Sequence, residues 1–267
     1  MSKPTVVGVC HICGNRKELT YEHVPPRSAF NDQRTIGLSF ERAMDLGVED
    51  TPTKGLIQQQ GSGAYTLCSK CNNNTGAWYV SDFARWCRQA MNVLTRSGCE
   101  EHQSIYFQDI YPIRILKEVV TMFFSINYTM HEVQPDLVRF VLDKERTTLP
   151  PKFRFFVYLT RSPRCRYVNV VGLLKLDSPH KTHLVSEINR PPLGYVMTID
   201  SPAPDNRLFE ITHFAHYHYD DRKTMTLKLP MLEVYTAIPG DYRTKQEIVD
   251  QQRASLEMMA KWSGLKR

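Results

Sequence analysis

The sequence contains no long apolar run and no segment of strongly biased composition. A helix that crosses a membrane needs about 20 consecutive, mostly apolar residues, and no stretch approaches that length. The first residues, Met1 to Pro4, lack the charged and then apolar order of a secretion signal. We therefore expect a cytoplasmic protein that does not associate with membranes.

Patterns that mark small-ligand sites and nucleic-acid tails are also missing. Residues 130–267 contain no glycine-rich phosphate loop and no other nucleotide motif. The net charge of +6 over 267 residues is a mild basic bias, too evenly spread to identify a polyanionic partner by itself. Because long basic runs are absent, affinity for a nucleic acid has to come from a folded groove.

The seven cysteines do not form the even, regular set of a disulfide framework. Cys87, Cys99 and Cys165 are scattered singly along the chain. The other four form two Cys-x-x-Cys pairs, a spacing that points both sulfurs of a pair toward a single ion. The sequence therefore predicts a structural Zn²⁺ site in a reducing compartment. Its ligands are Cys10, Cys13, Cys68 and Cys71.

The part of the chain before about residue 80 is rich in Gly, Asn, Thr and Pro and has few apolar stretches. Zinc ligation is expected to substitute for the missing core of this part. Between the cysteine pairs, most of the excursion from Pro25 to Tyr65 is predicted to be an irregular surface loop. One short helix is expected within it, over Phe40–Leu46.

Helical periodicity appears three times after the second cysteine pair. The first helix is predicted from Thr75 onward, because Trp78, Phe83, Trp86, Ala90 and Leu94 recur at three- and four-residue steps. The second is predicted over Pro112–Ile126, which has a broad apolar face. The third, over Lys245–Trp262, is expected to close the fold with Ile248, Leu256, Met259 and Trp262 on one side.

Six short alternating or β-branched runs follow Pro150 and predict an antiparallel meander. They cover residues 153–160, 167–176, 183–188, 195–200, 208–219 and 224–234. A hydrophobic content of 42% is ample for a packed core. The predicted fold class is α+β: a zinc-stapled N-terminal module over residues 1–95, linking helices over 96–130, and an antiparallel β-rich domain with a closing helix over 131–267.

An acid and an imidazole lie side by side inside the excursion, at Glu22 and His23, and Asn72 directly follows the second cysteine pair. Because zinc ligation pins the two ends of the excursion beside each other, the three side chains are predicted to converge on one point. Simpler interpretations stay open. Glu22 and His23 would form a surface pair beside a zinc finger, and residues 72–74 a turn and helix cap.

The order Cys-x-x-Cys, Glu-His-Val-Pro-Pro, Cys-x-x-Cys-Asn resembles the His-Me finger (HNH) endonucleases of the treble-clef type. The resemblance covers roughly the first 80 to 95 residues. It implies a ββα-metal module that hydrolyses phosphodiester bonds, in DNA rather than RNA. His23 would be the general base, and Glu22 and Asn72 would hold a catalytic Mg²⁺ or Mn²⁺. Asn73 and Asn74 are the alternatives to Asn72.

Elementary chemistry agrees with these roles. A neutral imidazole, with a pKa near about 6.5, accepts a proton from water at cellular pH. Carboxylate and amide oxygens suit a hard cation such as Mg²⁺, whereas thiolates retain zinc. Arg27 and Lys70 are placed where a side-chain cation can bind a flanking phosphate.

The sequence departs from the family pattern at three points. The acid is Glu22, where many relatives carry Asp. The excursion from His23 to Cys68 is longer than a compact hairpin requires. The middle asparagine of the family has no clear counterpart, although Asn31 is a candidate, so the group that orients His23 is not assigned.

Other functions remain open on the sequence alone. One alternative is a catalytically silent zinc finger that binds nucleic acid or protein. Another is a nuclease that stays inactive until its C-terminal part binds a signal. That part is expected to serve targeting, regulation or homo-oligomerisation, in a setting such as bacterial anti-phage defence or restriction.

Four other histidines are not expected to bind metal. His11 is expected to be exposed on the zinc knuckle. His213, His216 and His218 are expected to face solvent or an interface on a strand, rather than to bind metal.

Overall fold

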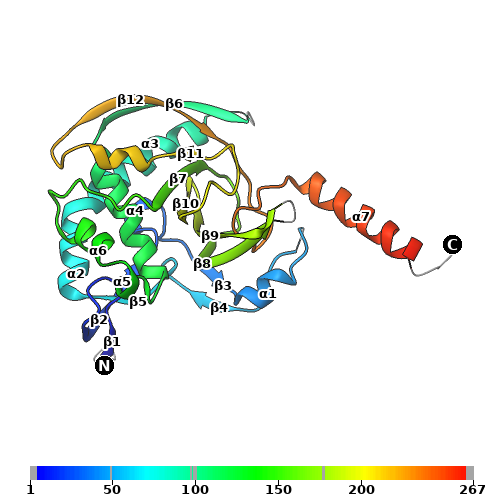
Figure 1. Cartoon of the computed structure of the whole chain (residues 1–267), viewed down its shortest axis with the longest axis horizontal. Coiled ribbons are helices and arrows are strands. Elements are labelled where there is room, and N and C mark those ends of the chain that lie inside the picture. The colour runs from blue at the N-terminus through cyan, green and yellow to red at the C-terminus, as the bar shows by residue number, and fades with distance from the viewer. Residues whose placement is uncertain (1–4, 49, 97, 99–100, 176–177, 263–267) are drawn as a thin grey trace.

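The computed structural model describes residues 5–48, 50–96, 98, 101–175 and 178–262. It combines helices with antiparallel sheets and carries a four-cysteine cluster near the N-terminus. Figure 1 shows the N-terminal strands at one end and the last helix projecting from the opposite side. The mixed α+β class predicted from the sequence is therefore confirmed.

The N-terminal sheet has three antiparallel strands in the order β1-β2-β5. Their bounds are β1 Val6–Val9, β2 Arg16–His23 and β5 Gly63–Cys68. A tight turn joins β1 to β2, closed by hydrogen bonds from Cys10 N to Asn15 O and from Gly14 N to Cys10 O. Gly14 has φ +71°, a left-handed conformation that favours glycine. This turn presents the first cysteine pair.

The excursion between β2 and β5 is more ordered than the sequence predicts. After a single 3₁₀ turn over Arg27–Ala29, strands β3 Thr35–Gly37 and β4 Leu56–Gln58 pair as a separate antiparallel ribbon. The short predicted helix is present as α1 Phe40–Met44, capped by the Ser39 side chain. The sequence does not predict this ribbon, because each of its strands has only three residues.

A long helical stretch begins directly at the second cysteine pair. It consists of α2 Ser69–Thr75, a π-helical turn over Gly76–Val80 and α3 Ser81–Leu94. The helix predicted from Thr75 is therefore present, but it starts six residues earlier. Phe83, Trp86, Ala90 and Leu94 are buried along one face, as the periodicity indicates.

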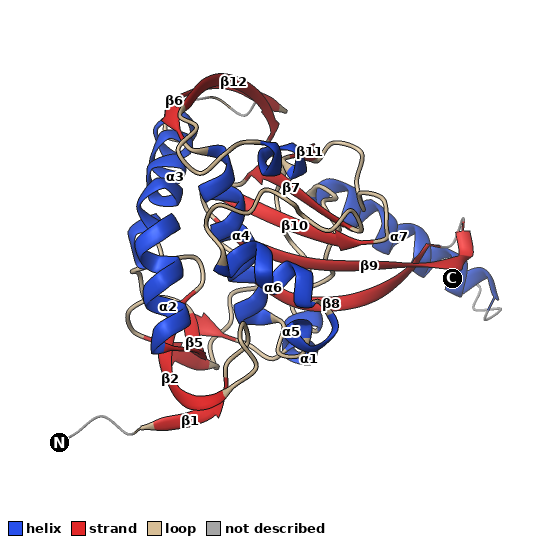
Figure 2. Ribbon diagram, turned by 60° about the vertical axis from the view of Figure 1, so that its left-hand side comes forward, coloured by secondary structure: helices blue, strands red, loops and turns tan. Residues whose placement is uncertain are grey.

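Helix α4, Pro112–Ile126, is the centre of the main core. Its bounds match the prediction, with proline at the first turn, where its missing N–H costs no hydrogen bond. All but two of its residues are buried. Figure 2 shows α4 between the helical stretch α2–α3 and the large sheet. Two short helices follow, α5 Met130–Val133 and α6 Pro135–Leu142.

The large sheet has five antiparallel strands in the order β11-β7-β10-β9-β8. Their bounds are β7 Phe153–Leu159, β8 Arg166–Lys175, β9 Ser178–Arg190, β10 Leu193–Ile199 and β11 Phe209–Glu210. In a meander each strand pairs with the next strand along the chain, and only β8, β9 and β10 do so. The run 208–219 is wrong as a single strand, because after β11 it continues as a 3₁₀ helix over Thr212–His216.

The last predicted strand belongs to another sheet. Strand β12, Lys223–Pro230, pairs with β6, His102–Ile110, a strand that the sequence analysis did not identify. The pairing joins segments more than a hundred residues apart, so no local turn signal announces it. The buried side chains of β6, among them Ile105 and Phe107, belong to the main core.

Helix α7 spans Lys245–Trp262 as predicted, but it does not close the fold. Figure 1 shows it extending away from the body. Of its predicted apolar side, only Ile248 is buried, whereas Leu256, Met259 and Trp262 are 67%, 62% and 82% exposed.

Candidate metal centre and neighbouring polar site

The two cysteine pairs form one compact cluster at the junction of the N-terminal sheet and α2. Cys10 and Cys13 come from the β1–β2 turn, Cys68 ends β5, and Cys71 lies in the first turn of α2. All four Sγ atoms lie within 4.8 Å of one another, and Cys13 Sγ is 3.9 Å from Cys68 Sγ. A tetrahedral zinc shell with Zn–S bonds of about 2.3 Å requires S–S separations of about 3.8 Å. The cluster therefore fits zinc.

The hydrogen bonds of the cluster favour a thiolate at Cys10, whereas burial raises the pKa of Cys13 and the hydrogen bond with Cys10 raises the pKa of Cys71. The Cys68 N–H donates to Cys10 Sγ at 3.3 Å, and a hydrogen bond from Cys71 helps lower the pKa of Cys10 to about 4. Cys10, Cys68 and Cys71 are buried, which protects them from solvent. Among the described residues, these four cysteines are the only group of three or more potential ligands close enough to hold a metal ion.

His11 is not the exposed residue that the sequence analysis expects. It is half-buried, its Nδ1 lies 2.9 Å from Ser125 O at the end of α4, and its ring packs edge-on against Tyr128. His11, one of the two residues between the first two cysteines, thus connects the cysteine cluster to the end of the central helix.

Glu22 and Asn72 meet on the inner face of β2. Asn72 Nδ2 donates to Thr20 Oγ1 at 2.9 Å, and Asn72 is also hydrogen-bonded to Glu22. Thr20 Oγ1 in turn donates to Leu67 O on β5. Glu22 is 9% exposed, and burial raises the pKa of its carboxyl to about 7, although the Asn72 hydrogen bond partly counteracts this.

His23 lies on the other face of β2. Its ring centroid is 5.0 Å from that of Tyr21, and Tyr21 contacts Tyr65 of β5 at 5.4 Å. Successive side chains of a strand point to opposite faces, so Tyr21 and His23 share one face, while Thr20 and Glu22 share the other. The structure therefore brings Glu22 and Asn72 together but directs His23 away from them.

His23 is held by a backbone carbonyl. Its Nε2 lies 3.2 Å from Gln60 O, and burial lowers the pKa of the imidazole, aided by the nearby positive charge of Arg27. The segment that carries Gln60 is in turn fixed by Asn31, which is fully buried. Asn31 Nδ2 donates to Pro25 O at 2.6 Å and to Ser62 O at 2.7 Å, and Asn31 Oδ1 accepts from Ser62 N at 2.7 Å.

The remaining predicted site residues differ in exposure. Arg27 opens the 3₁₀ turn and is exposed close to His23. Lys70 and Asn73 are exposed on α2, and Asn74 is half-buried. Asn72 is thus the asparagine of this run that contacts the acid.

A second buried acid lies near the first and was not singled out from the sequence. Glu118 on α4 is 1% exposed, and neither of its carboxylate oxygens has a hydrogen-bond partner. Burial raises its pKa well above the usual range, and the charge of Glu22 raises it further. A single acid within the apolar run from Ile115 to Phe124 is the sequence signal that would have identified it.

The three C-terminal histidines do not lie on a strand. His213 and His216 belong to the 3₁₀ helix, His218 follows it, and all three are exposed. In the part of the chain that the structure describes, no helix has the length and apolar character needed to span a membrane.

Comparison of the chain with protein-family models, with curated proteins and with solved structures finds no match.

Proposed function

We propose that the N-terminal part is a treble-clef HNH module and that the chain is a metal-dependent endonuclease acting on DNA. A zinc-binding turn, a pair of antiparallel strands and a helix that begins at the second cysteine pair occur in the order expected for such a module. Helix α4 would support this module, because His11 lies against the end of this helix.

The observation that carries the proposal is the contact between Glu22 and Asn72 beside the cysteine cluster. The Asn72 amide nitrogen donates to Thr20 and faces Glu22, so a rotation of the amide would bring its oxygen to a cation shared with Glu22. A carboxylate and an amide oxygen are a donor set that suits Mg²⁺ or Mn²⁺. When bound there, the cation would neutralise charge at the scissile phosphate.

His23 would serve as the general base. If Nε2–H donates to the Gln60 carbonyl, Nδ1 carries the free lone pair that accepts a proton from water. The lowered pKa of the imidazole keeps it neutral at pH 7, as this role requires. Asn31 would correspond to the middle asparagine of the family, since it fixes the segment that orients His23.

Glu22 and His23 are the last two residues of β2. A phosphodiester held at the end of this strand would therefore be flanked by the acid on one face and the imidazole on the other. The exposed Arg27 lies beside His23, where its guanidinium would bind a neighbouring phosphate. Tyr21 and Tyr65, 37% and 39% exposed on the same face, would contact the nucleic acid.

One feature favours a second function, a catalytically silent zinc-stabilised binding module. Glu22 is nine-tenths buried, and the His23 ring faces away from it. A module of this kind would use the exposed face of Tyr21 and Tyr65 for binding and would not need a catalytic cation.

The two functions are separated by incubating the purified protein with supercoiled plasmid DNA and Mg²⁺ or Mn²⁺, with a parallel RNA substrate. The nuclease proposal predicts nicking or linearisation that is lost in His23→Ala and retained in His216→Ala, a matched change at an exposed histidine. Retained zinc and an unchanged melting temperature show that both variants are folded. Binding of DNA without cleavage by the wild-type protein, or equal cleavage by wild type and His23→Ala, supports the silent module.

A further inference from the structure

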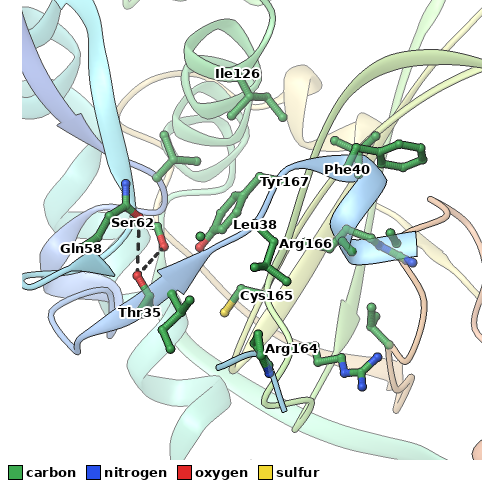
Figure 3. A pocket seen from close by; sticks show the side chains of 18 of the residues that line it. Thr35, Leu38, Phe40, Gln58, Ser62, Ile126, Arg164, Cys165, Arg166 and Tyr167 are labelled. Carbon is green, nitrogen blue, oxygen red and sulfur yellow. Dashed lines mark hydrogen bonds between the residues drawn. The ribbon is translucent and has the colours of Figure 1, made fainter. Parts of the chain in front are cut away.

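A cavity of about 610 Å³ lies between the N-terminal excursion and the large sheet. Its walls come from the β3–α1 segment, from β5, from the end of α4 and from the start of β8. Figure 3 shows Thr35, Gln58 and Ser62 grouped on one side of the cavity and Arg164 and Arg166 on another. The volume falls within the range of roughly 300–1,000 Å³ typical of small-molecule sites.

The charge of the lining is positive. Arg34, Arg164 and Arg166 line the cavity, and no carboxylate is among its described lining residues. Arg166 is neutralised by a buried ion pair with Glu187 at 2.6 Å. The hydrogen bonds of Arg164 go to backbone carbonyls, including Tyr235 O at 2.6 Å, so they leave its charge uncompensated. An anion in the cavity would supply the missing countercharge.

Two hydroxyl groups of the lining have no partner. Thr66 Oγ1 on β5 and Ser125 Oγ on α4 are buried without a hydrogen bond, in residues that are 5% and 4% exposed. Buried polar groups are nearly always hydrogen-bonded, because an unpaired one loses its interaction with water and gains nothing in return. These two residues come from different elements of the cavity wall, and each hydroxyl lacks a partner that a polar ligand could supply.

The rest of the lining is apolar. Four apolar side chains line the cavity without being fully buried. Phe40 and Ile36 are 50% and 40% exposed, and Leu38 and Ile126 are half-buried. An apolar or aromatic body placed between them would remove this surface from water, at about 25 cal/mol per Å². The cavity therefore combines an anion-binding part with an apolar part.

We propose that this cavity binds a small organic anion, with an apolar or aromatic body that contacts Ile36, Leu38 and Phe40 and a phosphate or carboxylate group held by Arg34 and Arg164. The ligand would also hydrogen-bond to Thr66 and Ser125. Because it touches both the N-terminal excursion and the start of β8, it would stabilise the contact between them. This site is separate from the zinc cluster, none of whose ligands lines it.

The cavity adjoins the proposed nuclease site. Ala64, which lines the cavity, is the cross-strand partner of Glu22, and Val24, two residues beyond Glu22, lines it as well. Ligand binding would therefore affect β2, the strand that carries Glu22 and His23, through its neighbour β5. The binding itself does not depend on nuclease activity, so it is tested without DNA or added divalent cations.

The experiment uses two fluorescent probes with nearly the same aromatic body, the anion 8-anilinonaphthalene-1-sulfonate and the uncharged N-phenyl-1-naphthylamine. The wild-type protein should bind the anion at least about tenfold more tightly. Competition by adenosine monophosphate and by indole-3-acetate then distinguishes a phosphate from a carboxylate ligand, since the preferred group displaces the anionic probe at lower concentration.

Three variants test the assignment. Arg34→Glu reverses an exposed charge of the lining and should weaken binding of the anionic probe by about tenfold or more. Arg42→Glu, a reversal on exposed α1 outside the lining, should leave binding unchanged. Thr66→Val removes an unpaired hydroxyl, so competitor binding should weaken while the melting temperature does not fall.

The proposal is overturned if the wild-type protein binds both probes equally or neither of them, or if Arg34→Glu and Arg42→Glu have the same effect. It is also overturned if Thr66→Val lowers the melting temperature without changing competitor binding, because the hydroxyl would then be structural. None of these results bears on the nuclease assay, so the two proposals fail separately.

Discussion

Asn31 and Ser62 are joined by two hydrogen bonds of 2.7 Å, one in each direction, across 31 residues of sequence. The Asn31 amide thereby substitutes for a strand partner and closes the excursion between β2 and β5. Since Gln60 lies two residues before Ser62 and holds the His23 ring, this contact connects the stability of the loop with the geometry of the proposed base.

Replacing Asn31 by alanine removes three hydrogen bonds at a fully buried site and leaves Ser62 N–H without its partner. We expect the free energy of unfolding to fall by about 3 kcal/mol, at roughly 1 kcal/mol for each bond. Urea unfolding measures this loss. Asn73→Ala, at an exposed position on α2, is the control and should cost no more than about 0.5 kcal/mol. Equal effects of the two changes would contradict the assigned role of Asn31.

Cys71→Ser should abolish zinc binding and unfold the N-terminal part, because zinc ligation contributes about 10 kcal/mol or more in comparable sites. Elemental analysis and thermal melting measure both effects. Cys165→Ser, outside the cluster, should retain the full complement of zinc. A Cys71→Ser protein that keeps its zinc and its melting temperature would show that the cluster is not a metal site.

Glu118→Gln should change how stability depends on pH. In the unfolded chain this carboxyl ionises near its ordinary pKa of 4.5, whereas in the folded chain burial keeps it protonated to higher pH. Over that interval the folded state holds the extra proton. The free energy of unfolding of the wild-type protein therefore falls as pH rises, by up to about 1.4 kcal/mol per pH unit.

The glutamine variant lacks this proton uptake, so its stability relative to wild type should increase as the pH rises from 5 toward the raised pKa of the folded carboxyl. Denaturant unfolding at several pH values measures the difference. Glu257→Gln, on the exposed part of α7, should run parallel to wild type. A difference between Glu118→Gln and wild type that stays constant over this range would mean that the carboxyl is ionised in the folded protein.

Two ion pairs of equal length offer a test of burial. Arg166–Glu187 and Arg154–Glu210 both have N···O distances of 2.6 Å, but the first pair is buried and the second is more than one-third exposed. Arg166→Met leaves a buried carboxylate without its cation and should cost about 3–5 kcal/mol. Arg154→Met should cost less than about 1 kcal/mol. Similar losses in urea unfolding would contradict the assigned difference.

Several elements were predictable because their signals are local. The bounds of α4 and α7 follow from helical periodicity, and the cysteine cluster follows from two short spacings. The pairing of β6 with β12 and the strand order of the large sheet depend on contacts far apart in sequence. The exposure of α7 was unpredictable for a similar reason, since an amphipathic pattern does not specify whether a partner surface exists.

The arrangement of the site residues could be predicted only in part, for a different reason. That Glu22 and Asn72 would meet followed from the cysteine spacing, but the prediction that His23 would join them overlooked strand alternation. Adjacent residues of a strand point to opposite faces, so two neighbours cannot both face inward unless the strand has ended. In the sequence, Asn31 is only a candidate for the middle asparagine of the family. Its structural role depends on Ser62, which lies beside it in the folded chain.

Whether Glu22 and Asn72 hold a divalent cation is measured by Mn²⁺ binding followed by electron paramagnetic resonance. We expect one Mn²⁺ per zinc-loaded chain, with binding weakened at least about tenfold in Glu22→Ala and in Asn72→Ala while the zinc content stays the same. If the wild-type protein binds no Mn²⁺, or if the two variants bind it as tightly as the wild type, Glu22 and Asn72 do not form a cation site.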